Sequence, residues 1–169
     1  VILVVAAGND GELVTDQFPM SHPKVIAVAA TGPADQLAPF SNFGPNVIIA
    51  APGGMGAGGN GQQVSPILST LPQNGYGVMS GTSMAAPHVA GLIGLMLSLN
   101  PTLQLEQIRD LLKRGADEID VIPAFHPDLG QRMWRVNAGR TLRLVKSEYP
   151  YVDPNPRPST TTTTASGPP

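Results

Sequence analysis

The sequence predicts an α/β fold, in which helices pack on both faces of a mainly parallel sheet. Continuous runs of β-branched residues and alanine are typical of strands buried on both faces of a parallel sheet. The chain has three such runs, at residues 1–7, 25–30 and 47–51. A long apolar helical segment and an amphipathic one follow them, and these would cover the sheet.

The first predicted strand, residues 1–7, opens the chain with neither an initiator Met nor a basic leader. A strand buried on both faces is an unexpected first element for a domain, so we expect the chain to be the C-terminal part of a longer polypeptide. The strand ends at Gly8-Asn9-Asp10-Gly11, which is typical of a tight turn.

The middle of the chain contains a glycine run and a predicted hairpin. Residues 53–61 hold six glycines and indicate a flexible surface insertion. A phosphate-binding loop is the alternative, but no Lys-Ser/Thr pair follows the run. Residues 67–71 and 76–80 flank the turn residues 72–75 and predict a β-hairpin.

Three helices are predicted in the second half. Residues 83–99 are apolar nearly all round, which predicts a buried helix that ends at Asn100-Pro101. Residues 103–114 are amphipathic, and Gly115 is the expected stop after the last turn. A last helix covers about 138–145. We place the domain at 1–146 and a Pro/Thr-rich linker or tail at 147–169, because no apolar periodicity remains there.

Composition excludes several classes of function. The 169 residues carry a net charge of −2, with 13% charged residues and no cysteine. Nothing basic suggests a nucleic-acid partner, and no run of about 18 apolar residues suggests a membrane partner. Without cysteine there is neither a disulfide framework nor thiolate chemistry.

The most informative stretch is residues 81–91, GTSMAAPHVAG. It predicts a turn followed by Ser83 in the first turn of a helix, where the helix dipole favours an attacking oxygen and a developing oxyanion. Pro87 is tolerable near a helix start. The simplest alternative is that Ser83 is only a helix N-cap.

As a whole, residues 81–91 resemble the nucleophile motif of the subtilisin-like serine proteases. Gly8-Asn9 after a strand resembles a second motif of that family, and Phe40-Ser41-Asn42-Phe43-Gly44-Pro45 a third, in the family's order. The resemblance covers about residues 1–144. It implies a secreted serine endopeptidase in which Ser83 attacks the scissile carbonyl, while Asn9 and the Ser83 backbone N–H hold the oxyanion.

The resemblance also implies substrate-binding positions. One wall of the pocket for the residue before the cut would be Ala6, Ala7 and Gly8, with the loop at Asp16 and Gln17 near its base; Thr82 is assigned to substrate binding as well. Two specificities stay open: Asp10 and Asp16 could favour Lys or Arg, or the pocket could be broad and apolar.

Some subtilases bind a weak cation in a loop that corresponds to residues 20–25, helped by a carboxylate after the Ser-Asn-Phe-Gly-Pro segment. Here that region offers Asn46, Val47 and Ile48, none of them acidic. Hard cations prefer charged oxygen ligands. We therefore expect no metal site or cofactor on this chain, and any calcium would bind the portion that precedes it.

A serine nucleophile needs a base, and the base needs an orienting carboxylate. In the family both precede the region covered here, so we expect the triad Asp and His to come from the N-terminal portion of the same protease or from a second chain. His88 lies five residues from Ser83, about 140° round a helix, which indicates a structural histidine. His22 and His126 lack the expected sequence context.

Two other functions remain as alternatives. The segment GTSMA loosely resembles the Gly-x-Ser-x-Gly elbow of the α/β-hydrolases, where Asp117 or Asp120 with His126 could complete a triad. The chain could also be a catalytically inactive, subtilase-like scaffold or binding module. Peptides or proteins are the expected substrates of the protease.

Overall fold

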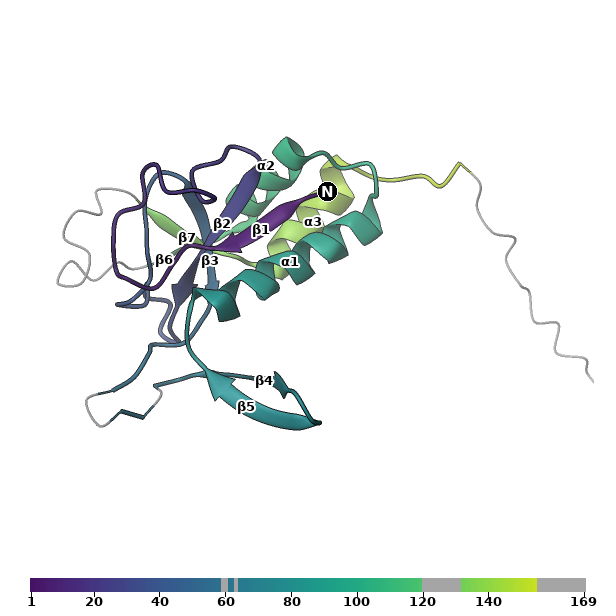
Figure 1. Cartoon of the computed structure of the whole chain (residues 1–169). Coiled ribbons are helices and arrows are strands. Elements are labelled where there is room, and N and C mark those ends of the chain that lie inside the picture. Colours follow the sequence, from purple (N-terminus) through teal and green to yellow (C-terminus); the bar gives the residue numbers. More distant parts are fainter. Residues whose placement is uncertain (59–60, 63, 120–131, 155–169) are drawn as a thin grey trace, which may run out of the picture.

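The computed structural model describes residues 1–58, 61–62, 64–119 and 132–154. The strands are β1 (Leu3–Ala6), β2 (Val25–Thr31), β3 (Val47–Pro52), β4 (Ile67–Leu71), β5 (Gly75–Met79), β6 (Asp117–Ile119) and β7 (Met133–Arg135). The helices are α1 (Thr82–Leu99), α2 (Leu105–Gly115) and α3 (Ala138–Glu148). Five strands form one sheet in the order β1-β2-β3-β7-β6, and β4 and β5 form a separate hairpin (Figure 1).

The sheet is mainly parallel, as the sequence predicts. Strands β1, β2, β3 and β7 pair in parallel, and β6 adds an antiparallel edge. All seven residues of β2, which lies between β1 and β3, are buried. Strand β1 is an edge strand of the described sheet, and Leu3 is 54% exposed, so this strand is not buried on both faces as the sequence predicted.

The predicted α/β fold with a mainly parallel sheet is confirmed, and the helices among the described residues pack on one face of that sheet. Alternate strand residues, among them Val28 and Ala51, pack with side chains of α1, α2 and α3. The intervening residues, such as Ala29, pack with Val14 and Phe43, which lie outside named helices and strands. Loop segments therefore cover the second face.

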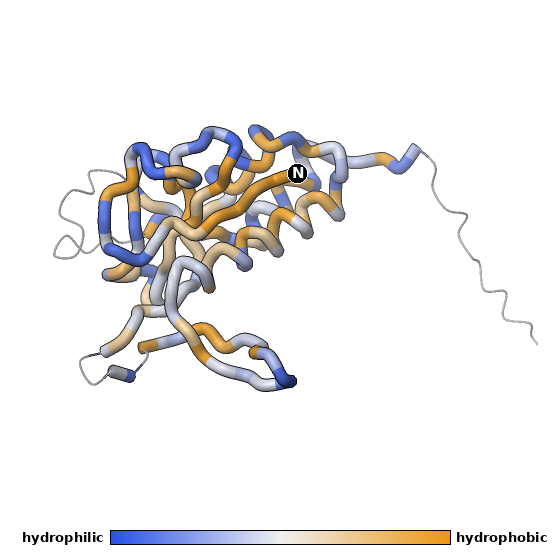
Figure 2. The backbone as a smooth tube through the Cα atoms, viewed as in Figure 1, coloured by the Kyte–Doolittle hydropathy of each residue, from blue (hydrophilic) through white to orange (hydrophobic). Residues whose placement is uncertain are grey.

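Helix α1 crosses the sheet in contact with β1, β2 and β3, but it is not buried all round. Its inner side carries Ala85, Val89 and Met96, while Gly91, Gly94 and other residues of its outer side are exposed. By length and composition alone α1 could span a membrane. This is weak evidence for a membrane span, because a core helix that packs on a sheet passes the same test. Figure 2 shows apolar colouring along β1 and parts of α1.

Two predicted boundaries are corrected in the C-terminal region. Gly115 is the last residue of α2 and lies buried, and a Cβ there would come within 2.3 Å of Thr141 Oγ1 in α3. The glycine therefore permits close helix packing and is not a stop signal beyond the helix. Helix α3 continues to Glu148, past the predicted domain boundary at 146. Residues 155–169 of the predicted linker lie outside the described residues.

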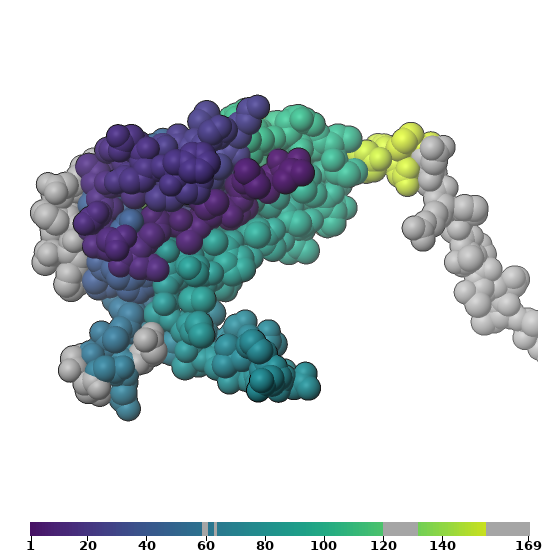
Figure 3. Space-filling view, viewed as in Figure 1, coloured from purple at the N-terminus to yellow at the C-terminus, as the bar shows by residue number. Residues whose placement is uncertain are grey.

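The predicted hairpin is present, and it stands away from the sheet and helices (Figures 1 and 3). The glycine run before it is only partly a surface insertion. Gly53 is buried, and a Cβ there would come within 2.5 Å of Ala30 Cβ and 2.8 Å of the Gly81 carbonyl oxygen. Its own carbonyl accepts a hydrogen bond from Gly81 N–H at 2.8 Å, which fixes the chain just before α1.

Candidate active site

Ser83 lies in the first turn of α1, with its side chain exposed. Gly81 is the N-cap residue, with a φ of 153°, and no side chain caps the helix. The alternative that Ser83 is only an N-cap is therefore wrong, since Ser83 is the second helical residue. Its hydroxyl is available at the positive end of the helix dipole.

Asn9 is held beside Ser83 by the residue between Gly81 and Ser83. The Asn9 Oδ1 accepts hydrogen bonds from Thr82 N–H at 2.8 Å and from the Thr82 hydroxyl at 2.9 Å. Because a backbone N–H can only donate, the amide atom facing it is oxygen, and Nδ2 is left as a donor at an exposed position. The Thr82 hydroxyl in turn accepts from Gly8 N–H at 3.2 Å.

A cavity of about 310 Å³ adjoins the serine. It lies between the hairpin and the start of α1. Its lining residues are Ile67, Leu68, Ser69, Ser83, Met84, Pro87 and His88. Ser83 thus faces open space into which another group could be placed.

The histidines do not supply a base to Ser83 within the described part of the chain. His88 lines the same cavity, but its Nδ1 lies 2.9 Å from the Met84 carbonyl oxygen, one helical turn back. His22 Nδ1 accepts a hydrogen bond from Lys24 N–H, and His126 lies outside the described residues. Among the described residues, no hydrogen bond joins Ser83 to a histidine or a carboxylate.

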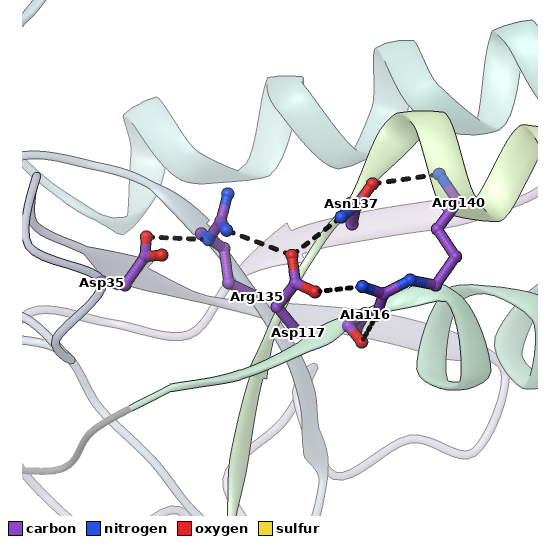
Figure 4. A network of polar contacts seen from close by, with 6 residues as sticks. All are labelled: Asp35, Ala116, Asp117, Arg135, Asn137 and Arg140. Carbon is purple, nitrogen blue, oxygen red and sulfur yellow. Dashed lines mark hydrogen bonds and ion pairs between the residues drawn. The ribbon is translucent and has the colours of Figure 1, made fainter.

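Asp117 serves a structural network at the far edge of the sheet from β1 (Figure 4). Its carboxylate accepts from Asn137 at 2.8 Å and forms ion pairs with Arg140 at 2.7 Å and Arg135 at 3.2 Å. The Asn137 hydrogen bond, and then the two guanidinium groups, hold the pKa of Asp117 below its usual range despite partial desolvation. A hydrolase triad that uses Asp117 is therefore not supported. Asp120, the other candidate, lies outside the described residues.

The predicted substrate-binding positions differ in burial. Ala6 and Gly8 are half-buried, and Asp16 and Gln17 are exposed on the loop after Val14. Ala7 is fully buried and has no surface for a substrate, so direct contact by this residue is excluded. Thr82 is excluded for the same reason, and its contacts make it a positioning residue for Asn9.

No group of three His, Cys, Asp or Glu residues in the described ranges is arranged to hold a metal ion. Asn46 lies after the Ser-Asn-Phe-Gly-Pro segment, where a carboxylate would help to bind a cation. Its side-chain N–H donates a hydrogen bond to the Thr15 carbonyl at 2.7 Å. Its nitrogen faces that loop, where a cation would need an oxygen.

Sequence reasoning missed two contributors to the site. One is the pair of hydrogen bonds from Thr82 to Asn9. The motif shows Thr82 only as the residue next to the serine and does not reveal these bonds. The other is Asn42, which binds the turn that carries Asn9. Asn42 belongs to one of the motifs noted above, but its contacts depend on tertiary structure.

Comparison with known proteins gives a consistent result. The model of the Subtilase family matches residues 1–162. Subtilisin of Bacillus pumilus is 42% identical over 119 residues, which cover 69% of this chain and 39% of that protein. An extracellular basic protease of Dichelobacter nodosus is 37% identical over 166 residues, covering 92% of this chain and 25% of that protein.

Among solved structures, a protease from Pseudoalteromonas arctica superposes with a TM-score of 0.71 at 30% identity. The match covers 85% of this chain and 42% of that one. The chain therefore spans less than half the length of each of these relatives.

Proposed function

Because this chain belongs to the subtilase family, we propose that it is part of a serine endopeptidase whose nucleophile is Ser83. One observation supports this most strongly. Thr82, the residue that precedes Ser83, donates two hydrogen bonds to the oxygen of the Asn9 amide, so the exposed Asn9 is held next to the exposed serine. A scaffold has no need of this arrangement.

In the proposed reaction, the Ser83 hydroxyl gives its proton to a base while its oxygen bonds to the carbonyl carbon of the peptide. The Asn9 Nδ2 and the Ser83 N–H donate to the oxyanion that forms. The C–N bond then breaks, the base returns the proton to the leaving amine, and an acyl-enzyme remains on Ser83. Water hydrolyses that ester by the same steps.

We infer that the base and its orienting carboxylate come from the N-terminal portion of the same protease, in the same chain or a second one. Three features support this partner. Strand β1 has an unpaired outer edge in the described sheet, the outer side of α1 is apolar and open, and the cavity beside Ser83 has room for a side chain. Open strand edges and apolar faces are costly unless they are covered.

The remaining assignments follow from the same proposal. Peptides or proteins are the substrates, with Ala6 and Gly8 at the wall of the pocket and Asp16 and Gln17 on a neighbouring loop. Any calcium would bind the N-terminal portion. Secretion is supported by the Dichelobacter nodosus relative, which is an extracellular basic protease.

The test is peptide hydrolysis by the complete protease. Ser83→Ala should lower kcat by about 10⁶-fold, a loss known for the nucleophile of a subtilisin and taken over from it. Ser98→Ala is the matched control, because Ser98 is exposed on the same helix and only donates to the Leu95 carbonyl. If the parent protein has no turnover, the scaffold alternative is supported. If Ser83→Ala keeps the turnover, Ser83 is not the nucleophile and the proposal fails.

A further inference from the structure

Asn42 binds the turn that carries Asn9 on both sides of that residue. Its Oδ1 accepts hydrogen bonds from Asp10 N–H at 2.9 Å and Glu12 N–H at 3.0 Å. Its own backbone N–H donates to the Gly8 carbonyl at 3.0 Å. The backbone on both sides of Asn9 is therefore hydrogen-bonded to Asn42, either to its side chain or to its backbone N–H.

The Asn42 side chain uses both ends of its amide. Two backbone N–H groups face one end, which must therefore be the oxygen. The other end, Nδ2, lies 3.4 Å from a carboxylate oxygen of Asp10. Asn42 is only 6% exposed, so these bonds are made in a site largely shielded from water.

Packing at Gly8 makes the arrangement tight. Gly8 has a φ of 104°, and a Cβ on it would come within 2.3 Å of Asn42 Nδ2. The Asn42 amide therefore occupies the space next to the backbone of the turn. Two further backbone bonds, Gly11 N–H to Phe40 O at 2.8 Å and Phe43 N–H to Glu12 O at 3.0 Å, align the two loops.

Thr82 bonds to the side chain of Asn9, and Asn42 bonds to the backbone before and after Asn9. We propose that Asn42 is a positioning residue for the oxyanion donor: it holds residues 8–12 so that Asn9 Nδ2 stays oriented toward the developing oxyanion. This inference rests on the function proposed above. Asn42 forms no hydrogen bond with Ser83 in the described structure, so its effect passes through Asn9.

The residue type is set by its partners. An aspartate at position 42 would still accept the two backbone N–H groups, but it would place a second carboxylate about where Nδ2 lies, 3.4 Å from that of Asp10. Like charges so close repel each other and would displace the turn. Asn at position 10 would restore the bond with donor and acceptor exchanged.

The test uses the complete protease and four proteins: the parent, Asn42→Asp, Asp10→Asn and the double variant. Asn42→Asp should lower kcat by about 10- to 100-fold with KM little changed, the scale expected when a reacting group is displaced by about 1 Å. Most of that loss should be absent when Asn42→Asp is introduced into the Asp10→Asn variant, so the kcat of the double variant should be close to that of Asp10→Asn alone. A loss without recovery would overturn the proposed bond exchange.

A second cycle separates positioning from a general effect on folding. In an Asn9→Ala background, Asn42→Asp should have little further effect on kcat, because the donor that it positions is gone. Equal losses in both backgrounds would overturn the inference. If Asn9→Ala and Ser83→Ala themselves leave turnover intact, the proposed function fails; if they abolish or lower it while Asn42→Asp does not, only the inference about Asn42 fails.

Discussion

At the scale of single residues, the account depends on Asn9. Its Oδ1 is bonded to Thr82, and the Nδ2 that remains is the proposed oxyanion donor. A donor placed for the transition state acts on turnover more than on binding. Asn9→Ala in the complete protease should lower kcat by about 10²–10³-fold with KM little changed; this range is that of the same donor in a subtilisin and is taken over from it. An unchanged kcat with a lowered Tm would make Asn9 only a turn residue.

Specificity is also decided by single residues. The Asp10 carboxylate faces Asn42 Nδ2 at 3.4 Å, and Asp16 accepts from the Thr15 hydroxyl at 3.3 Å. Both carboxylates thus have local partners, which favours the broad apolar pocket over one selective for basic residues. Cleavage of a peptide library should show no gain for Lys or Arg over aromatic residues before the cut. A clear preference for Lys or Arg would instead assign these carboxylates to the pocket.

At the scale of elements, the contact between α2 and α3 requires a glycine. A Cβ on Gly115 would lie 2.3 Å from Thr141 Oγ1 and 2.8 Å from Thr141 Cα. Gly115→Ala should therefore destabilise the protein by about 1–3 kcal/mol, the usual cost of overpacking. Gly139→Ala is the control, because a Cβ there meets its nearest neighbour at 3.5 Å. Chemical denaturation measures both, and equal stabilities would contradict the close packing.

The junction of β6, β7 and α3 depends on the Asp117 carboxylate. Its pKa is lowered in the folded protein, so its charged form contributes stability above the unfolded pKa of about 4, and this contribution is lost as the pH falls through the folded value. Asp117→Asn should therefore lower Tm at pH 7, and the difference from the parent should shrink below about pH 4. A difference in Tm that stays the same from pH 7 to pH 3 would contradict the ionic role.

The sequence predicted the central elements well, for identifiable reasons. Strand β2 and helix α1 have strong patterns, and the order of three motifs indicated the family. The helices on one face, the exposed outer side of α1 and the role of Gly115 could not be predicted, because each depends on which surfaces meet in three dimensions. The same holds within the site: Thr82 and Asn42 act through contacts 73 and 30–32 residues away along the chain.

At the scale of the whole molecule, we propose that the chain is one portion of a larger catalytic domain. It spans less than half of the relatives described above, and β1 and α1 leave an open strand edge and an apolar face. The proposed active site therefore joins two portions of one domain: Ser83 and Asn9 lie here, and the base lies in the other. Reactivity of the serine should depend on both portions being present.

The most direct measurement is labelling with a fluorophosphonate, which reacts with activated serines, followed by mass spectrometry of the labelled peptide. The complete protease should be labelled at Ser83, and Ser83→Ala should remove the label. Residues 1–169 alone, without the rest of the domain, should react far more slowly. Labelling at another serine, or rapid labelling of Ser83 in the isolated chain, would contradict a nucleophile that depends on a base from the N-terminal portion.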